Sequence, residues 1–220
     1  TGLGGLLDLG APENASHCVA TARSTNDWDM AGAMLAALAF IVFTVSFLPC
    51  GILFLSAPVL TQWFAIDIAG ADAFTNSLQW VALTLPLALI GLIAEGIIKG
   101  FERYGIARGI EVWTSFAYGL GCYLCIRWEL SYITIIHLTI ILSTIRAIIA
   151  LLFCIKCFTN IPVKFTNWRT VGLPKAWKRI CVTAPSKIWG TLQTQSQPFL
   201  IGALLGTTSA AIYDVLMRLP

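Results

Sequence analysis

Long uncharged stretches of apolar residues alternate with short polar segments along the whole chain. Residues 30–66, 73–94 and 188–213 each contain no Asp, Glu, Lys or Arg. About 20 apolar residues of helix cross the hydrocarbon core of a bilayer, so each stretch is long enough to span it. Strands of a membrane β-barrel would instead alternate polar and apolar residues over about 10 positions. The pattern therefore predicts transmembrane helices.

The uncharged stretches predict an all-α membrane protein, a bundle of about six spans with the start of another. The first stretch is too long for one span, so we expect a break at Pro49, Gly51 or Pro58 and an interfacial tail after it. The expected spans lie near 1–20 (partial), 31–56, 73–98, 104–126, 130–155 and, after a basic segment, in 188–220, where the next span also begins.

Composition narrows the class of protein further. The chain is 57% hydrophobic and 11% charged, with a mean hydropathy of +0.80. Soluble domains contain about 25% charged residues, so a disordered chain, a nucleic-acid-binding module and a secreted disulfide scaffold are all excluded. The chain does not begin with Met and ends inside an apolar segment, so we interpret it as an internal fragment.

The distribution of charge predicts an orientation. No acidic residue lies between Glu129 and Asp214, and the segment 156–187 is rich in cations. Cytoplasmic loops of membrane proteins carry an excess of Lys and Arg, so we expect 156–187 to be a cytoplasmic loop. A second interpretation is that these cations hold anionic lipid headgroups. The cations are Lys156, Lys164, Arg169, Lys175, Lys178, Arg179 and Lys187.

One ionisable residue lies deep in a predicted span. Arg146 is near the middle of 130–155, where exposure to lipid costs at least about 2.5–3.5 kcal/mol. Helical spacing places Tyr132, Thr139, Ser143 and Arg146 on one stripe. The stripe is typical of a hydrated cavity that binds a substrate, and the alternative is a static arginine tied to a carbonyl or a carboxylate. His137 lies on another face, and we interpret it as a hydrogen-bonded packing residue.

A second polar cluster lies in the span that follows the basic segment. Gln193 and Gln197 are four residues apart, and Pro198 would bend the helix beside them. Amides donate and accept hydrogen bonds, which suits a sugar, although they also join helices within a membrane. Glu95 and Lys99 have the i, i+4 spacing of a structural ion pair.

The sequence gives no sign of catalysis, and we predict neither an enzyme nor a cofactor. It contains no phosphate-binding loop and no nucleophile elbow. The pairs Cys122-x-x-Cys125 and Cys154-x-x-Cys157 have the spacing of zinc ligands. The predicted topology places the two pairs on opposite sides of the membrane, so we expect no metal site.

Two stretches resemble the polysaccharide flippases of the Wzx type, within the multidrug/oligosaccharidyl-lipid/polysaccharide exporter superfamily. Leu7-Asp8-Leu9-Gly10 with Val19-Ala20 is similar to the second span of that family. The stretch Thr194-Gln195-Ser196-Gln197-Pro198-Phe199-Leu200-Ile201-Gly202, continuing to Tyr213, is similar to its seventh span and the start of its eighth. The resemblance implies that 1–155 is mostly one lobe, that 156–187 links two lobes and that 188–220 opens the second.

The resemblance also implies a function and a set of partners. Such a protein flips a lipid-linked oligosaccharide across the bacterial inner membrane by alternating access, beside the polysaccharide polymerase and export machinery. Arg146 would attract the diphosphate, and Gln193 and Gln197 would contact sugar hydroxyls. Asp8 and His17 are candidates for coupling to protons or sodium, and a cavity-facing His17 would make binding depend on pH near about 6.5.

Two alternatives to the flippase stay open. A multidrug or cation antiporter of the related exporter family would need a carboxylate committed to the core of the lobe. A membrane enzyme of polysaccharide or cell-wall synthesis would need an acid/base or metal cluster in a loop at the membrane surface.

Overall fold

The computed structural model describes residues 8–63, 68–159, 161 and 167–205. These residues are almost entirely helical, which confirms the predicted all-α class. The helices are α2 (Ala11–Thr25), α3 (Trp28–Trp63), α4 (Ile68–Gly100), α5 (Tyr104–Arg127), α6 (Tyr132–Phe158), the π-helical turn η1 (Trp168–Gly172) and α7 (Leu173–Leu205).

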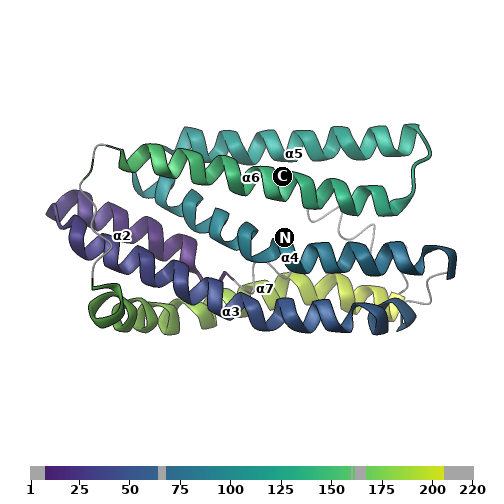
Figure 1. Ribbon diagram of the computed structural model, residues 1–220, viewed down its shortest axis with the longest axis horizontal. Helices are drawn as coiled ribbons and strands as arrows, with labels where there is room; N and C mark the ends of the chain where they lie inside the picture. Colours follow the sequence, from purple (N-terminus) through teal and green to yellow (C-terminus); the bar gives the residue numbers. More distant parts are fainter. Residues whose placement is uncertain (1–7, 64–67, 160, 162–166, 206–220) are drawn as a thin grey trace.

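The long helices lie side by side in an elongated bundle (Figure 1). Helices α5 and α6 form an antiparallel hairpin along one side, α3 and α7 lie along the other, and α4 runs between them. Helix α4 bends near its middle and contains Pro86, which removes one backbone donor and accounts for the bend. The short α2 packs against the second half of α4.

Aromatic contacts join the start of α3, the end of α4 and the end of α6 at one end of the bundle. The ring of Phe101, just after α4, stacks on Trp28 at 5.7 Å and meets Phe158 edge-on at 5.3 Å. Arg23 of α2 forms an ion pair with Glu102 at 3.1 Å beside them. We call this the basic end, because it also carries Lys99, Arg103 and Lys156.

Polar contacts mark the opposite end of the bundle. The hydroxyls of Thr61 and Thr75 are 2.8 Å apart and join the end of α3 to the start of α4. The Ser77 hydroxyl lies 3.3 Å from Nε2 of His137, which gives this histidine the hydrogen-bond partner expected for it. Successive long helices therefore run in alternate directions, as the predicted spans do.

Small residues allow the backbones of α4 and α2 to approach closely. A Cβ added to Gly96 would lie 2.2 Å from the carbonyl oxygen of Pro12, and one added to Gly100 would lie 2.6 Å from that of Ser16. Close approach at small residues is typical of helix packing within membranes, where van der Waals contact replaces the hydrophobic effect. The turn of α2 from Pro12 to Ser16 therefore packs directly against the turn of α4 from Gly96 to Gly100.

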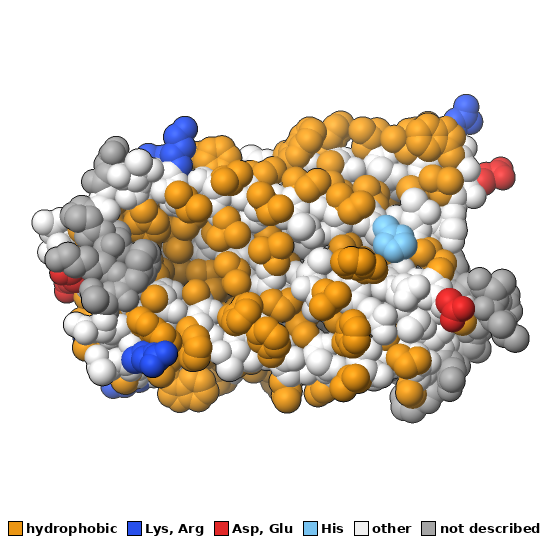
Figure 2. Space-filling view, in the orientation of Figure 1, with side chains coloured by type: hydrophobic (Ala, Val, Ile, Leu, Met, Phe, Trp, Pro, Cys, Tyr) orange, Lys and Arg blue, Asp and Glu red, His pale blue; other side chains and the backbone are white. Residues whose placement is uncertain are grey.

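Within the part of the chain that the structure describes, three helices have the length and composition of membrane spans: Trp28–Thr61, Ala71–Gly100 and Ile133–Phe158. Large apolar side chains on their outer faces are exposed, among them Leu48, Leu55 and Leu152, as lipid contact requires. Figure 2 shows charged side chains near the two ends of one face and a mainly hydrophobic band between them. Helices α5 and α7, which were also expected to be spans, are not among the three.

The predicted break in the first span is wrong. Helix α3 continues through Pro49 and Pro58 to Trp63 instead of ending near residue 56. A break in lipid would leave several backbone groups without partners, each at a cost of several kcal/mol, whereas a proline within a helix frees only one carbonyl. The continuous helix is therefore favoured over the broken one.

The predicted loop at 156–187 is also corrected by the structure. Helix α6 extends to Phe158, η1 begins at Trp168, and α7 begins at Leu173 rather than near 188. The sequence 173–187 has apolar positions at helical spacing, and three of them, Ala176, Ile180 and Ala184, are buried. Burial of that face stabilises a helix even though its other face is strongly basic. Residues 206–220, where the next span was expected to begin, lie outside the described residues.

Candidate functional site

A pocket of about 700 Å³ lies where α2, the start of α3 and the first half of α7 meet. Its wall comprises Glu13, Asn14, His17, Cys18, Thr21, Ala22, Thr25, Asp27, Met30, Ala31, Met34, Lys175, Lys178, Arg179, Val182 and Thr183. The volume is in the range of ligand-binding pockets, about 300–1,000 Å³. We call it the basic pocket.

Helical periodicity explains why these residues face the pocket. On α7 the lining positions are 175, 178, 179, 182 and 183, which recur every three or four residues. On α2 they recur in the same way from Glu13 to Thr25. Helix α2 ends at Asn26, whose left-handed backbone (φ 57°) stops the helix and turns the chain into α3. The turn brings Met30 and Met34 to the third side of the pocket.

Polar contacts join α2 to α7 across the pocket. The buried Asn14 amide donates hydrogen bonds to the Gly10 carbonyl at 3.0 Å and to the Thr183 hydroxyl at 2.9 Å. Nδ1 of His17 lies 3.2 Å from Nη1 of Arg179, and its ring is exposed. Since guanidinium groups only donate, Nδ1 of His17 accepts this hydrogen bond. The arrangement therefore requires a lone pair on Nδ1 of His17.

The charge of the pocket is mainly positive. Lys175, Lys178 and Arg179 project from α7, while the acidic residues are Glu13 and Asp27. Glu13 forms an ion pair with Lys187, and this hydrogen bond raises the pKa of Lys187. An oxygen of Asp27 accepts a hydrogen bond from the Met30 amide at 3.1 Å. Both acids thus have local partners, and the positive wall suits an anionic ligand.

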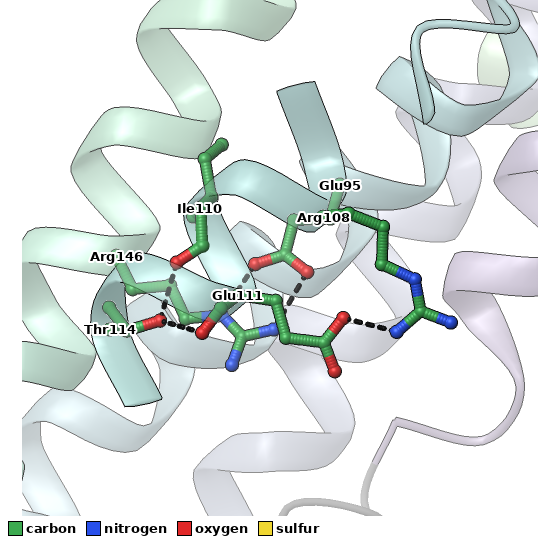
Figure 3. Close-up of polar contacts among 6 residues, drawn as sticks. All are labelled: Glu95, Arg108, Ile110, Glu111, Thr114 and Arg146. Atoms are coloured by element: carbon green, nitrogen blue, oxygen red, sulfur yellow. Dashed lines mark hydrogen bonds and ion pairs between the residues drawn. The ribbon is translucent and has the colours of Figure 1, made fainter. Parts of the chain in front are cut away.

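The predicted cavity arginine, Arg146, is held by a carboxylate. Its Nε donates to Oε1 of Glu95 at 2.6 Å, and its Nη2 donates to Oε2 at 2.8 Å (Figure 3). The Glu95 side chain is 6% exposed and that of Arg146 is 29% exposed. The structure thus shows the second of the two roles considered for Arg146, a strut between α4 and α6. Glu95 was expected to pair with Lys99, and its bidentate partner is instead 51 residues away.

The other residues of the predicted stripe on α6 lie apart from the basic pocket. Thr139 is exposed and its hydroxyl donates to the Ile135 carbonyl at 2.9 Å, while Ser143 is half-buried. Neither residue lines the basic pocket. The side chain of Tyr132 lies outside the described residues. The structure therefore does not bring this stripe and the pocket together.

The remaining predicted site residues are divided between the pocket and other places. His17 lines the pocket, whereas Asp8 is buried beside it and accepts a hydrogen bond from the Gly10 amide at 2.8 Å. Burial raises the pKa of the Asp8 carboxyl. Gln193 is exposed on α7, about three turns beyond the pocket residue Thr183, and the side chain of Gln197 lies outside the described residues.

Sequence reasoning missed the three cations of the pocket as a group. Lys175, Lys178 and Arg179 were assigned to a loop and interpreted as an orientation signal or as a site for anionic lipid headgroups. Their spacing of three and four residues, continued by Val182 and Thr183, was the signal for a helix with one basic face. The two Cys-x-x-Cys pairs do lie near opposite ends of the bundle, Cys125 near the end of α5 and Cys157 near the basic end of α6.

Comparison of the chain with protein-family models, with curated proteins and with solved structures gave no match.

Proposed function

We propose that this protein is a membrane transporter that flips a lipid-linked oligosaccharide from the cytoplasmic to the outer leaflet of a bacterial inner membrane by alternating access. One structural observation carries the proposal: a pocket of about 700 Å³ beside three span-length apolar helices, with Lys175, Lys178 and Arg179 on one wall. The resemblance of the sequence to Wzx-type flippases points to the same class of function.

The chemistry of the basic pocket fits the polar part of such a substrate. A diphosphate linker is anionic, and Arg and Lys bind phosphate oxygens through charge-assisted hydrogen bonds. Thr21 contributes a hydroxyl and Asn14 an amide to the same wall, and these groups suit sugar hydroxyls. We therefore assign diphosphate binding to Lys178 and Arg179 in place of Arg146, because the guanidinium of Arg146 is already bound to Glu95.

The pairing of Glu95 weakens the case for a cation antiporter. An antiporter needs a carboxylate that is free to bind a proton or a cation within the membrane. Glu95 is a buried carboxylate of the span-length helix α4, but both of its oxygens accept hydrogen bonds from Arg146. The flippase is therefore the better-supported transporter.

The positive-inside rule supports a cytoplasmic basic end. Arg103, Lys156 and the cations of the pocket lie at or near that end, whereas Asp72 and Glu129 lie toward the other. The pocket would then open toward the leaflet in which the substrate is assembled, and the polysaccharide polymerase would receive the flipped product on the other side.

Binding by the reconstituted chain tests this proposal. The protein is placed in nanodiscs, and a polyprenyl-diphosphate-linked oligosaccharide is titrated against it. The Lys178→Gln/Arg179→Gln variant should raise the Kd at least tenfold, because a hydrogen bond to a charged group contributes about 1.5–3 kcal/mol. The control Arg103→Gln/Lys156→Gln removes two cations from the same end outside the pocket and should change the Kd less than twofold. Equal Kd values for both variants would contradict the proposal.

A further inference from the structure

A second hollow of about 420 Å³ lies on the outside of the bundle, between α3 and α7. Phe40, Ile41 and Val45 of α3 line one side, and Leu173, Pro174 and Trp177 of α7 line the other. We call it the lateral groove. It is separate from the basic pocket, and no part of the proposed transport cycle uses it.

The lateral groove opens where a membrane helix faces lipid. Its α3 side lies within the span Trp28–Thr61. The side chain of Phe40 is 47% exposed and that of Trp177 is 55% exposed, and the neighbouring Phe43 and Phe47 are exposed too. An apolar groove in this position is filled at little cost by a hydrocarbon chain, whereas water would leave its aromatic walls unfavourably hydrated.

A cation lies at the edge of the groove. The Trp168 ring contacts Phe40 with centroids 4.9 Å apart, and the guanidinium carbon of Arg169 lies 5.1 Å from the centroid of that Trp168 ring. Lys175 follows Pro174 directly, and its Nζ reaches to 3.5 Å from the Met30 sulfur near the start of α3. The Lys175 ammonium thus points toward Met30 and the basic pocket, which both residues line, so the cation at the groove is Arg169.

No acidic side chain of the neighbouring sequence offsets the charge of Arg169. Helix α3 has no acid after Asp29, and no acid lies between Glu129 and Asp214. An apolar groove with uncompensated positive charge at one edge is complementary to an anionic lipid, which has a hydrocarbon chain below a phosphate. A zwitterionic lipid offers the same chain but places a cationic group beside the phosphate, so it matches the edge less well.

We propose that the lateral groove binds one anionic phospholipid, with an acyl chain against Phe40 and Trp177 and the phosphate on Arg169. The lipid covers the junction of η1, α7 and α3, so it holds the basic first half of α7 against the bundle. This lipid binding requires only that the protein is inserted in a membrane, so its test does not depend on the proposed transport function.

Native mass spectrometry of the full chain tests the lipid site. The protein is released from nanodiscs that contain phosphatidylglycerol and phosphatidylcholine with identical acyl chains, and the lipids that remain bound are counted. We expect one phosphatidylglycerol to be retained in preference to phosphatidylcholine. The Arg169→Gln variant and the Trp177→Ala variant should each lower the retained fraction at least fivefold. The Arg103→Gln/Lys156→Gln variant should leave the fraction unchanged.

Three results would overturn the lipid site. Equal retention of both lipids would show an apolar contact without recognition of the headgroup. Equal retention by the groove variants and the control would place the lipid elsewhere. A dimer that Trp177→Ala dissociates would assign the groove to a second copy of the chain. Helical circular dichroism of each variant verifies that the fold is intact, and Trp177→Phe, which keeps an aromatic wall, should retain the lipid.

Discussion

Arg146 of α6 and Glu95 of α4 form a bidentate ion pair inside the helix bundle, with N···O distances of 2.6 and 2.8 Å. The two helices meet beside this pair, because a Cβ added to Gly91 would lie only 2.6 Å from Ala147. The close contact brings the two charges together and excludes solvent from Glu95. The pair thus fixes α4 against α6 at one defined position.

Removal of Arg146 alone should be strongly destabilising. The Arg146→Ala variant leaves the Glu95 carboxylate buried without its partner, which costs about 3–5 kcal/mol. The free energy of unfolding in mixed detergent micelles measures the loss. The double variant Arg146→Met/Glu95→Gln removes both charges and should recover most of the stability.

The exposed pair Arg108–Glu111 on α5 is the control for this measurement (Figure 3). Solvent screens such pairs, so Arg108→Ala should change the free energy of unfolding by about 0–1 kcal/mol. Similar losses from Arg146→Ala and Arg108→Ala would contradict a structural role for the buried pair.

Hydropathy was sufficient to predict the helical class and the limits of α5 and α6. The segments 104–126 and 130–155 match α5 and α6 within three residues at each end, because lipid contact fixes the length of an apolar run. Rules for helix ends that hold in water failed for the helix that lies in the membrane. Pro49 and Pro58 would end many helices in water, whereas in α3 they are accommodated.

The candidate site was less predictable, because it depends on contacts between distant parts of the chain. Helical spacing favoured a Glu95–Lys99 pair, but Gly91 and Ala147 bring α6 close enough for Arg146 to reach Glu95. Likewise, net charge identified the basic segment without showing that one face of it covers α2. Only the tertiary arrangement places Arg179 beside His17.

Close packing of α2 on α4 should be sensitive to one methyl group. In Gly96→Ala the new Cβ meets the Pro12 carbonyl oxygen at 2.2 Å, so the helices must separate. We expect a loss of about 1–3 kcal/mol, as for other overpacked interiors. Gly109→Ala on α5 meets nothing within 4 Å and should stabilise the helix by up to about 1 kcal/mol. A loss of stability in both variants would contradict the packing described.

Asp8 should make stability depend on pH. Burial raises its pKa above the usual 3.8, so the folded state keeps a proton that the unfolded chain has released. The contribution of Asp8 to the free energy of unfolding should therefore be fully present below pH 3.8 and be lost as the pH rises through the higher folded-state pKa. The Asp8→Asn variant should lose this dependence, and Asp72→Asn, at an exposed position of α4, should keep it. Measurements between pH 3 and pH 7 in which Asp8→Asn and wild type stay parallel would exclude the effect.

The proposed orientation predicts which end of the helix bundle a reagent added outside the cell can modify. In a background without the native cysteines, Lys178→Cys and Asp72→Cys introduce single thiols toward the two ends of the bundle. A membrane-impermeant maleimide added to intact cells should label the thiol at 72 and leave that at 178 unmodified until the membrane is opened. Labelling of residue 178 in intact cells would reverse the orientation.

Transport of a lipid-linked oligosaccharide is tested most directly by its distribution between leaflets in cells. The gene that encodes the chain is deleted, and the lipid-linked oligosaccharide on each leaflet is measured with an impermeant lectin. The substrate should accumulate on the cytoplasmic leaflet, and wild type or Arg103→Gln/Lys156→Gln should restore its export. Lys178→Gln/Arg179→Gln should not restore export. An unchanged distribution after deletion, with greater sensitivity to cationic drugs, would contradict the flippase and favour an antiporter.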